Sequence, residues 1–428
     1  MKLSRFGQLM AQTSPIVQLM EDLGEALNIN PDLLFLGGGN PAQIPEAQTC
    51  FNKHIQAWQQ DSGVFNTVIG VYQSPQGNET VLENLAAYYR KECGWDVDAG
   101  NIALVNGSQT AFFLLFNLFS GQASEAVKRK VLLPMAPEYL GYASQGMSGE
   151  QFQIERPLLE LHDQHRFKYR INFDALDVHK DIGAICVSRP TNPSGNVLSM
   201  SELDQLSTLA EQANIPFIID LAYGKPFPGL TYHSPAPNWS ENIVAVMSMS
   251  KLGLPGVRTS VIVASEEIIQ LVVRANTIMS LASGNLGPEL LNRLIESGDL
   301  ERMSQQVLPT FYSSKRDRML ALLDEHLAGT HYRIHEPEGA FFVWLWLEGL
   351  PVTSQELYQR LKQKGVLVMA GEPFFFGLDK EWSHARECLR LSYCQADEVL
   401  EAAVKLIAEE LVTIGHGSAS NPVVASQV

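Results

Sequence analysis

A lysine stands where an apolar run gives way to a loop of small residues. Lys251 follows the apolar run 243–247 and lies within Ser-Met-Ser-Lys-Leu-Gly-Leu-Pro-Gly-Val-Arg, residues 248–258. Small hydroxyls, free backbone N–H groups and an arginine bind phosphate oxygens. The long lysine stem can carry its amine to a neighbouring aldehyde. The segment therefore predicts a Schiff-base lysine with Ser248 and Arg258 at a phosphate, as pyridoxal phosphate requires. On this segment alone, a surface lysine after a core strand is the alternative.

A second apolar run ends in a carboxylate. Asp220 follows Ile218 and Ile219, and Tyr223 comes three residues later. A buried carboxylate keeps the pyridine nitrogen of such a cofactor protonated, so that the ring withdraws electrons from the substrate's α-carbon. The Tyr223 hydroxyl is placed to donate to the ring oxygen. Taken alone, an aspartate at this position is more often a turn or helix-cap residue.

Asn192 lies in a loop with a restricted backbone. The segment Ser-Arg-Pro-Thr-Asn-Pro-Ser-Gly-Asn, residues 188–196, follows the apolar run 184–187. Its two prolines limit the conformations of their neighbours, so the Asn192 amide can be aimed at a ligand. The alternative is an ordinary strand-to-helix turn, where Asn-Pro is also common.

These loops follow short apolar runs that alternate with helical stretches, which predicts an α/β domain with a mostly parallel sheet. The runs are 102–105, 131–133, 185–187, 217–219, 244–247 and 261–263. Ser199 and Glu202 form a capping box that predicts a helix through Ala213. Ligands of open parallel sheets bind beyond the carboxyl ends of the strands, so the separate segments can converge on one cofactor.

Gly107, Ser108 and Gln109 follow the first of these runs and precede an apolar helical stretch. The backbone N–H groups at the start of a helix form an anion site. Taken alone, a Gly-Ser turn before a helix is more often only a cap.

Three motifs in this order and spacing resemble a known family: Asn192-Pro-Ser-Gly, Asp220-x-x-Tyr223 and Ser248-x-x-Lys251-x6-Arg258. They resemble the fold-type I pyridoxal phosphate aminotransferases of class I and II, the aspartate aminotransferase superfamily. The resemblance runs from about residue 36 to about residue 411. It is strongest to the bacterial valine–pyruvate aminotransferases, through residues 37–45, 136–142 and 250–256. It implies a large domain with a mostly parallel seven-stranded sheet flanked by helices, and a smaller α+β domain.

The resemblance assigns a role to each residue. Lys251 bonds the cofactor aldehyde and moves the proton at the substrate's α-carbon, Asp220 pairs with the pyridinium, and Asn192 and Tyr223 bond the ring oxygen. The implied phosphate ligands are Ser248, Ser250, Arg258, Gly107, Ser108 and Gln109.

Further roles follow from the same resemblance. Tyr139 would stack on the pyridine ring, Arg390, Asn192 and Gly39 would bind the substrate's α-carboxylate, and Tyr72 would reach across a homodimer interface to the partner's phosphate. From the residues alone, Tyr139 is more often a packing residue, and an arginine between two leucines more often faces solvent from a half-buried sheet.

The resemblance also implies a division of the chain into domains. The large cofactor-binding domain spans 49–309, the small domain combines 1–48 with 310–414, and residues 415–428 form a disordered tail. An amphipathic helix after Gly298, broken or started at Pro309, would join the domains. The small-domain strands are expected at 341–347, 366–369 and 389–392.

Composition narrows the class of partner. The 428 residues carry 31 basic and 47 acidic side chains, a net charge of −16, which argues against nucleic acid and anionic membranes. With no long apolar segment, we expect a cytoplasmic protein. The five cysteines contain no Cys-x-x-Cys pair, so reduced thiols are expected, and the ten histidines predict no metal site.

Three functions compete. The first is ping-pong amino transfer between amino acids and 2-oxo acids, and the second is another pyridoxal phosphate reaction, such as β-elimination from cysteine conjugates. The third is a non-catalytic regulator, which the early start of the cofactor pattern and the acidity disfavour. Residues 277–285 contain no cation, which favours a neutral substrate such as valine, alanine or 2-aminobutyrate, with pyruvate or 2-oxoisovalerate as the oxo acid.

Overall fold

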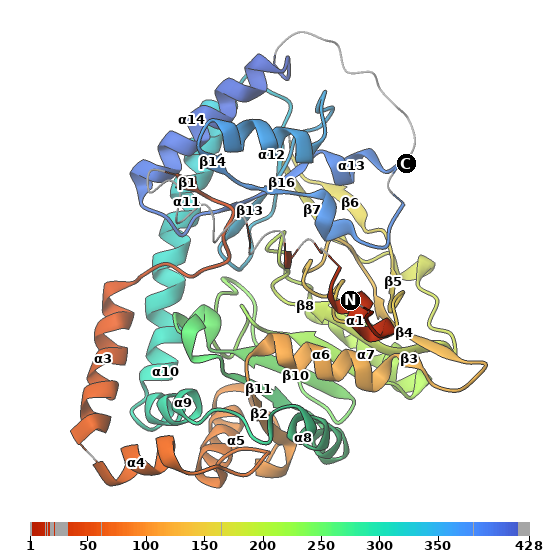
Figure 1. Ribbon diagram of the computed structural model, residues 1–428. Helices are drawn as coiled ribbons and strands as arrows, with labels where there is room; N and C mark the ends of the chain where they lie inside the picture. Colours follow the sequence, from red (N-terminus) through yellow and green to blue (C-terminus); the bar gives the residue numbers. More distant parts are fainter. Residues whose placement is uncertain are drawn as a thin grey trace.

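The computed structural model describes residues 2–12, 14, 16, 17, 21, 33–60, 62–163, 165–379 and 381–417. In these residues, a layered unit built on an eight-stranded sheet lies below a second unit built on a six-stranded sheet, and a long helix runs beside both (Figure 1). The predicted α/β fold class is confirmed.

The eight-stranded sheet contains all six predicted runs. Its order is β2 (Ile102–Val105), β11 (Ser260–Val263), β10 (Ile243–Ser248), β9 (Phe217–Asp220), β8 (Ile182–Ser188), β4 (Lys128–Leu133) and β3 (Gly121–Gln122), with β5 (Phe152–Ile154) also paired to β4. The strands from β5 through β4, β8 and β9 to β10 are parallel. β11 is antiparallel to both neighbours, and β3 to β4. The sheet has eight strands where seven were expected because the short β3 adds one at the edge.

Helices cover both faces of this sheet, because alternate residues of each strand point to opposite sides. One face packs against α6 (Ser108–Phe119) and α8 (Glu266–Ser280). The other packs against α5 (Glu79–Cys93), α7 (Met200–Ala213) and α9 (Leu286–Glu296). The predicted capping box of Ser199 and Glu202 is present at the start of α7, which ends at Ala213 as expected.

The six-stranded sheet has the order β15 (Met369–Ala370), β16 (Cys388–Ser392), β13 (Phe342–Trp346), β12 (Arg333–His335), β7 (Arg166–Arg170) and β6 (Leu158–Leu161). Two predicted strands, 341–347 and 389–392, correspond to β13 and β16. The third, 366–369, is split between β15 and β14 (Val366–Leu367), which pairs in parallel with β1 (Leu34–Phe35). α12 (Ser354–Gln363), α13 (Ser383–Arg386) and α14 (Asp397–Thr413) belong to the same unit. β7 pairs with β12 across the expected domain boundary at residue 310, and the division itself stays a prediction.

The long helix joining the two units begins as α10 (Asp299–Arg302), passes through a π-turn at Met303–Val307 and continues as α11 (Leu308–His326). Pro309 lies in the first turn of α11, where a missing N–H is tolerated. α3 (Pro45–Gln60) and α4 (Ser62–Gly70) lie along the outer side of the lower unit (Figure 1), and α1 (Arg5–Met10) is near the amino terminus. Of the predicted tail, only residues 415–417 are described. There His416 is buried, with Nε2 3.0 Å from the His331 carbonyl oxygen.

Candidate active site

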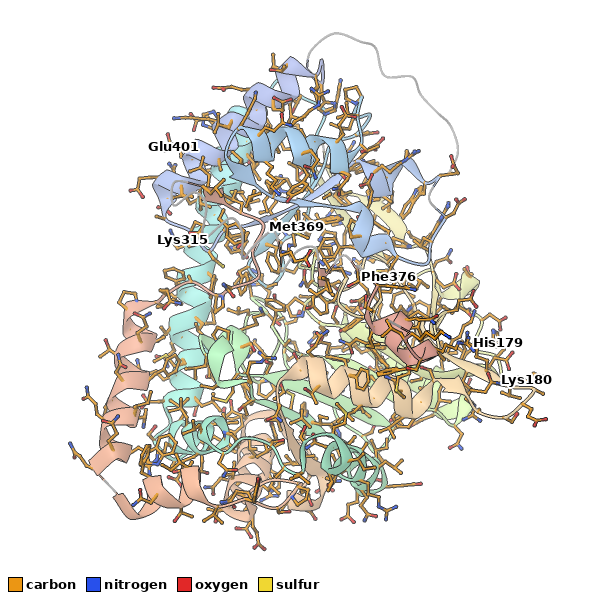
Figure 2. All side chains as sticks on the ribbon, in the orientation of Figure 1. His179, Lys180, Lys315, Met369, Phe376 and Glu401 are labelled. Carbon is orange, nitrogen blue, oxygen red and sulfur yellow. The ribbon has the colours of Figure 1, made fainter. Side chains whose placement is uncertain are left out.

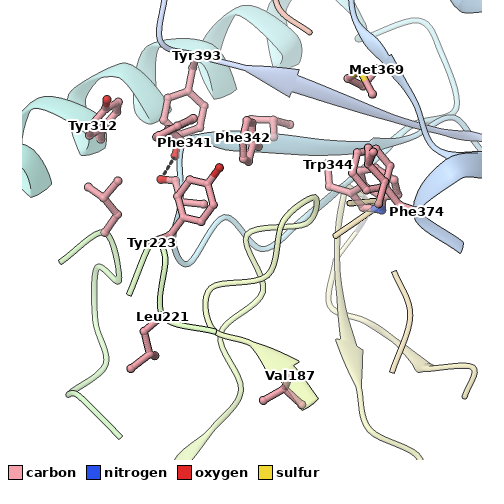
Figure 3. Close-up of a cluster of buried hydrophobic side chains, with 14 of the residues drawn as sticks. Val187, Leu221, Tyr223, Tyr312, Phe341, Phe342, Trp344, Met369, Phe374 and Tyr393 are labelled. Carbon is pink, nitrogen blue, oxygen red and sulfur yellow. Dashed lines mark hydrogen bonds between the residues drawn. The ribbon is translucent and has the colours of Figure 1, made fainter. Parts of the chain in front are cut away.

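The predicted site residues other than Tyr72 gather where the carboxyl ends of β8, β9 and β10 face the six-stranded sheet. Side chains fill this region between the two units (Figure 2). Figure 3 shows Tyr223 just above the strand ends, pointing toward Phe341 and Phe342 of the upper unit. The Tyr223 ring lies edge-on to both phenylalanines, with centroids 5.1 Å and 5.7 Å away. The site is therefore assembled from both sheets.

Lys251 lies in a single 3₁₀ turn, Ser250–Leu252, directly after β10. Its Nζ donates a hydrogen bond to the Gly39 carbonyl oxygen at 2.5 Å. It also lies 5.3 Å and 5.7 Å from the ring centroids of Tyr223 and Phe341. Burial lowers the pKa of the amine to about 8, with the positive charge of Arg390 adding to the effect. About a tenth of the amine is therefore neutral, and nucleophilic, at pH 7, far more than for an ordinary lysine.

Asp220 ends β9 as a buried carboxylate with two hydrogen-bond donors. The Tyr142 hydroxyl donates to Oδ2 at 2.6 Å and the Ala222 N–H donates to Oδ1 at 2.8 Å. Burial raises the pKa of Asp220 to about 6, while these two donors and the charge of Lys251 oppose the rise. The carboxylate is thus ionised at neutral pH and suited to a cationic partner. Sequence reasoning missed Tyr142, although its spacing in Tyr139-x-x-Tyr142 was visible.

The predicted phosphate ligands come together at the start of α6. A side chain on Gly107 would place its Cβ 2.2 Å from Arg258 Nη2, so the guanidinium lies directly over this glycine. Arg258 itself has φ +47°, a left-handed backbone, and its Nη1 donates to Ser250 Oγ at 3.3 Å. Ser108 and Gln109 form the first turn of α6, where backbone N–H groups lack intrahelical partners. Ser248 is buried, and its Oγ accepts from the Ser250 N–H at 3.2 Å.

Arg390 is buried rather than facing solvent, with 2% of its surface exposed. Its Nη1 donates to Asn192 Oδ1 and its Nη2 to the Gly37 carbonyl oxygen, both at 2.7 Å. The guanidinium carbon lies 4.2 Å from the ring centroid of Phe342 and 5.3 Å from that of Phe374. Its Nε has no hydrogen-bond partner among the described residues. A buried cation with a spare donor suits an anionic ligand.

Tyr139 is partly buried near the same charges. Burial raises the pKa of its hydroxyl, the positive charge of Arg390 opposes the rise, Asp220 adds to it, and Arg258 opposes it. Its ring is perpendicular to that of Tyr142, with centroids 5.4 Å apart. Tyr139 therefore lies among the cation, the carboxylate and the phosphate ligands.

Tyr72 is a predicted site residue that lies on an exposed surface, away from the others. It follows α4 and is 82% exposed, beside Ile69 and Val71, which are also exposed. The segment 277–285 lies next to it, because Asn285 Nδ2 donates to the carbonyl oxygens of Val68 and Val71 at 2.9 Å. The structure therefore places Tyr72 beside residues 277–285. Among the described residues of a single chain, its side chain does not contact the other predicted site residues.

A separate cluster of metal-binding residue types joins α3 to α10. Cys50, His54 and Asp299 hold their ligand atoms within 4.8 Å of one another. His54 Nε2 is 2.8 Å from Asp299 Oδ2, and the Arg302 guanidinium contacts Oδ1 at 3.1 Å. The carboxylate is therefore held by an ion pair, and the expectation of no metal stays a prediction.

The residues gathered at the strand ends fit a phosphate-bearing pyridine aldehyde. Arg258 and the α6 start supply phosphate donors, Asp220 supplies an anion for a ring nitrogen, and Lys251 supplies an amine of lowered pKa. The spare Nε of Arg390 adds a donor for a carboxylate. Each chemical group of the expected cofactor and substrate thus has a matching partner.

The chain is similar to known proteins along most of its length. A family model described as aminotransferase class I and II matches residues 36–407. A valine–pyruvate aminotransferase of Escherichia coli K12 is 46% identical over 96% of this chain and 98% of that enzyme. The crystal structure of a valine-pyruvate aminotransferase from Salmonella typhimurium LT2 is 44% identical, with a TM-score of 0.86 over 94% of this chain and 99% of that one. An aspartate aminotransferase from Thermus thermophilus shares the fold at 20% identity, with a TM-score of 0.75 over 96% of this chain and 99% of that one. Among the described residues, no helix is both long and apolar enough to span a membrane.

Proposed function

This chain belongs to the family of class I and II aminotransferases, and we propose that it moves an amino group between a neutral amino acid and a 2-oxo acid. Valine, alanine and 2-aminobutyrate are the proposed donors, and pyruvate and 2-oxoisovalerate the proposed acceptors. The observation that carries the proposal is the convergence of an amine, a carboxylate and a spare cation, Lys251, Asp220 and Arg390, in one buried region.

Pyridoxal 5′-phosphate is the proposed cofactor, and when bound it supplies an aldehyde and a ring that withdraws electrons. Asp220 would hold a proton on the ring nitrogen, and Arg258 with residues 107–109 would hold the phosphate. Asn192 and Tyr223 would donate to the ring oxygen, and Tyr139 would cover one face of the ring. Ser248 would also bind the phosphate, with Ser250 assisting.

Lys251 would act on protons at the substrate's α-carbon. Its lowered pKa supports this role, because a base works best when its pKa is near the working pH. Arg390 would bind the α-carboxylate through the face that carries its spare Nε, with Asn192 and Gly39 beside it. The hydrogen bond from Lys251 to Gly39 supports this assignment, because it brings the base next to the backbone that would face the carboxylate.

The preference for a neutral side chain rests on the segment 277–285, which carries no cation. A dicarboxylic substrate needs a second cation for its distal carboxylate, since an unpaired buried carboxylate is costly. Apolar pockets separate substrates that differ by one methylene by only about 1–3 kcal/mol. Several neutral amino acids are therefore proposed as substrates, in line with the activity named for the Escherichia coli relative.

A homodimer is proposed as the active form. Tyr72, Ile278 and Leu281 are 82%, 88% and 62% exposed, an apolar group that water contacts in the single chain. Tyr72 would reach the phosphate of the partner's site. The C2 arrangement common among homo-oligomers would let each chain complete the other.

A panel of amino donors against pyruvate tests the function. Purified protein supplied with pyridoxal 5′-phosphate should form alanine from valine and 2-aminobutyrate, with little product from aspartate or glutamate. Parallel assays should detect the matching 2-oxo acid in equal amount. Release of free ammonia without amino transfer, or a preference for aspartate, would contradict the proposal.

A further inference from the structure

A second buried carboxylate lies next to the candidate site and has no role in the function proposed above. Glu138 follows the end of β4 and is 2% exposed. Its Oε1 accepts from the Ser188 N–H at 2.9 Å. Its Oε2 accepts from the Ser188 hydroxyl at 2.5 Å and from the Tyr139 N–H at 3.1 Å. The carboxyl group thus receives hydrogen bonds from two segments of the site.

These contacts link Glu138 to three functional side chains. Tyr139 is the next residue, and Ser188 pairs with Asp220 across β8 and β9. The Ser188 carbonyl oxygen also accepts from the hydroxyl of Thr191, the residue before Asn192, at 3.0 Å. Glu138 therefore lies between the residue expected to cover the ring and the two residues expected to contact its nitrogen and oxygen.

A third link reaches the upper unit. The Glu138 N–H donates to the Phe374 carbonyl oxygen at 3.1 Å. The Phe374 ring packs against the Arg390 guanidinium. The residue thus also ties the ring-covering segment to the proposed carboxylate-binding arginine.

Resting on the proposed function, we propose that Glu138 is a positioning residue for the cofactor. Its carboxylate fixes the Tyr139 segment to the end of β8, and so holds Tyr139, Asn192 and Asp220 in the relative places that a pyridoxal phosphate ring requires.

The three donors require a carboxylate and not an amide. In Glu138→Gln, one oxygen can serve either the Ser188 N–H or the pair formed by the Tyr139 N–H and the Ser188 hydroxyl. Whichever way the amide turns, at least one buried backbone N–H faces an NH₂ group. An unpaired buried donor is costly, so the Tyr139 segment should shift.

The protonation of Glu138 depends on its burial and on the groups around it. Burial raises its pKa to about 7, the hydrogen bonds of Ser188 and Tyr139 oppose the rise, and the negative charge of Asp220 adds to it. Burial and the charge of Glu138 raise the pKa of the Cys186 thiol on β8. Burial also raises the pKa of the Tyr142 hydroxyl, and the charges of Asp220 and Glu138 add to that rise. Glu138 is therefore protonated in mildly acidic solution and ionised in mildly basic solution.

The test measures binding of 4′-deoxypyridoxine 5′-phosphate, a cofactor analogue without the aldehyde, to the apoenzyme by fluorescence quenching. This analogue cannot bond to Lys251, so its dissociation constant reports the positioning of the pocket alone. Glu138→Gln should weaken binding by about tenfold at pH 8. Ser188→Ala, which removes one donor and keeps the carboxylate, should weaken it by a smaller factor.

Glu202→Gln is the matched control. Glu202 is also a buried glutamate that accepts from a serine N–H and hydroxyl, those of Ser199, but it caps α7. A purely structural effect of losing such a carboxylate would appear in both variants. We expect binding by Glu202→Gln to match the unmodified protein.

A pH series supplies the second readout. At pH 5.5 Glu138 is protonated in the unmodified protein, and Asp220 titrates in both proteins, so the difference between Glu138→Gln and the parent should nearly vanish. Equal affinities of the two proteins at pH 8, or a ratio that is the same at both pH values, would overturn the proposal. Failure of the unmodified protein to bind the analogue would instead contradict the proposed function.

Discussion

The buried centre of the candidate site and its exposed edge differ in how completely one chain builds them. In the centre, Asp220 and Asn192 are both over 90% buried, and each is held by a hydrogen bond from another segment. At the edge, Tyr72 and Ile278 are more than 80% exposed, and their side chains extend into solvent. The fold of one chain therefore holds the side chains of the centre in place, whereas the side chains of the edge are exposed to solvent.

This contrast separates two kinds of function. The residues of the centre act on groups shared by all amino acids, namely the amino group, the α-carbon and the α-carboxylate. The residues of the edge are proposed to contact the substrate's side chain and the second subunit. Changes in the centre should therefore affect every substrate alike, and changes at the edge should depend on the substrate or on the partner.

The largest effect is expected for Lys251→Ala. The proposed amine and proton carrier are the same group, so amino transfer should be abolished while the fold persists. The variant should also lose the absorbance, near the edge of the visible range, of the cofactor bonded to the lysine. Lys315→Ala is the control, because Lys315 also donates to a carbonyl oxygen, that of Gln395, but from α11. Near-normal turnover by Lys251→Ala would remove this lysine from the mechanism.

The next largest effect is expected for Asp220→Asn. An amide cannot hold a proton on the ring nitrogen, so turnover should fall by roughly a thousandfold, or about 4 kcal/mol. Tyr142→Phe should lose about tenfold, because it removes one hydrogen bond and leaves the carboxylate. Steady-state kinetics with valine and pyruvate measures both. Activity of Asp220→Asn within a few-fold of the parent would refute the role of the carboxylate.

A smaller and uniform loss is expected for Arg390→Ala. Loss of a buried charge-assisted contact costs about 2–5 kcal/mol, so kcat/KM should fall by at least tenfold for alanine, valine and pyruvate alike. Substitutions within 277–285 should instead change the ratio between donors. Arg333→Ala, at a partly exposed arginine paired with Glu348, is the control. If Arg390→Ala spared the monocarboxylic donors, another cation would have to bind the carboxylate.

The smallest effect is expected at the edge, and it depends on the partner. Tyr72→Phe should be impaired because one phosphate contact from the second subunit is lost. Mixing these chains with Lys251→Ala chains, with subunit exchange, should raise activity above the average of the two parents. A hybrid dimer would place both defects in one site and neither in the other. An active monomer in sedimentation, or no gain on mixing when Tyr72→Phe is impaired, would contradict the dimer.

Local sequence patterns predicted the elements of the centre well. Each apolar run forms a strand because helices cover both faces of the sheet, so that side chains on either face are buried. In β8, every residue from Ile182 to Ser188 is buried. The capping box at Ser199 formed because its hydrogen bonds lie within four residues. The sequence pattern did not predict the direction of each strand. β11 is antiparallel to both neighbours, and an apolar run has the same pattern in either direction.

The features that sequence reasoning missed depend on distant contacts. Tyr142 and Glu138 read as parts of a turn, and their roles depend on Asp220 and Ser188, which are far along the chain. β7 pairs with β12 through a contact between segments more than 150 residues apart, and β6 joins the sheet through β7. The burial of Arg390 likewise depends on Phe342 and Phe374, whose rings both pack near its guanidinium. Local sequence motifs do not show which residues far apart in the chain are in contact.

The most direct test of the central claim is to identify the lysine that bonds the cofactor. Reduction of the protein with borohydride in the presence of pyridoxal 5′-phosphate fixes the cofactor to that lysine, and mass spectrometry of the peptides locates it. The account predicts one labelled residue, Lys251, with loss of the label in Lys251→Ala. A label on another lysine, or no label on a folded protein, would contradict it.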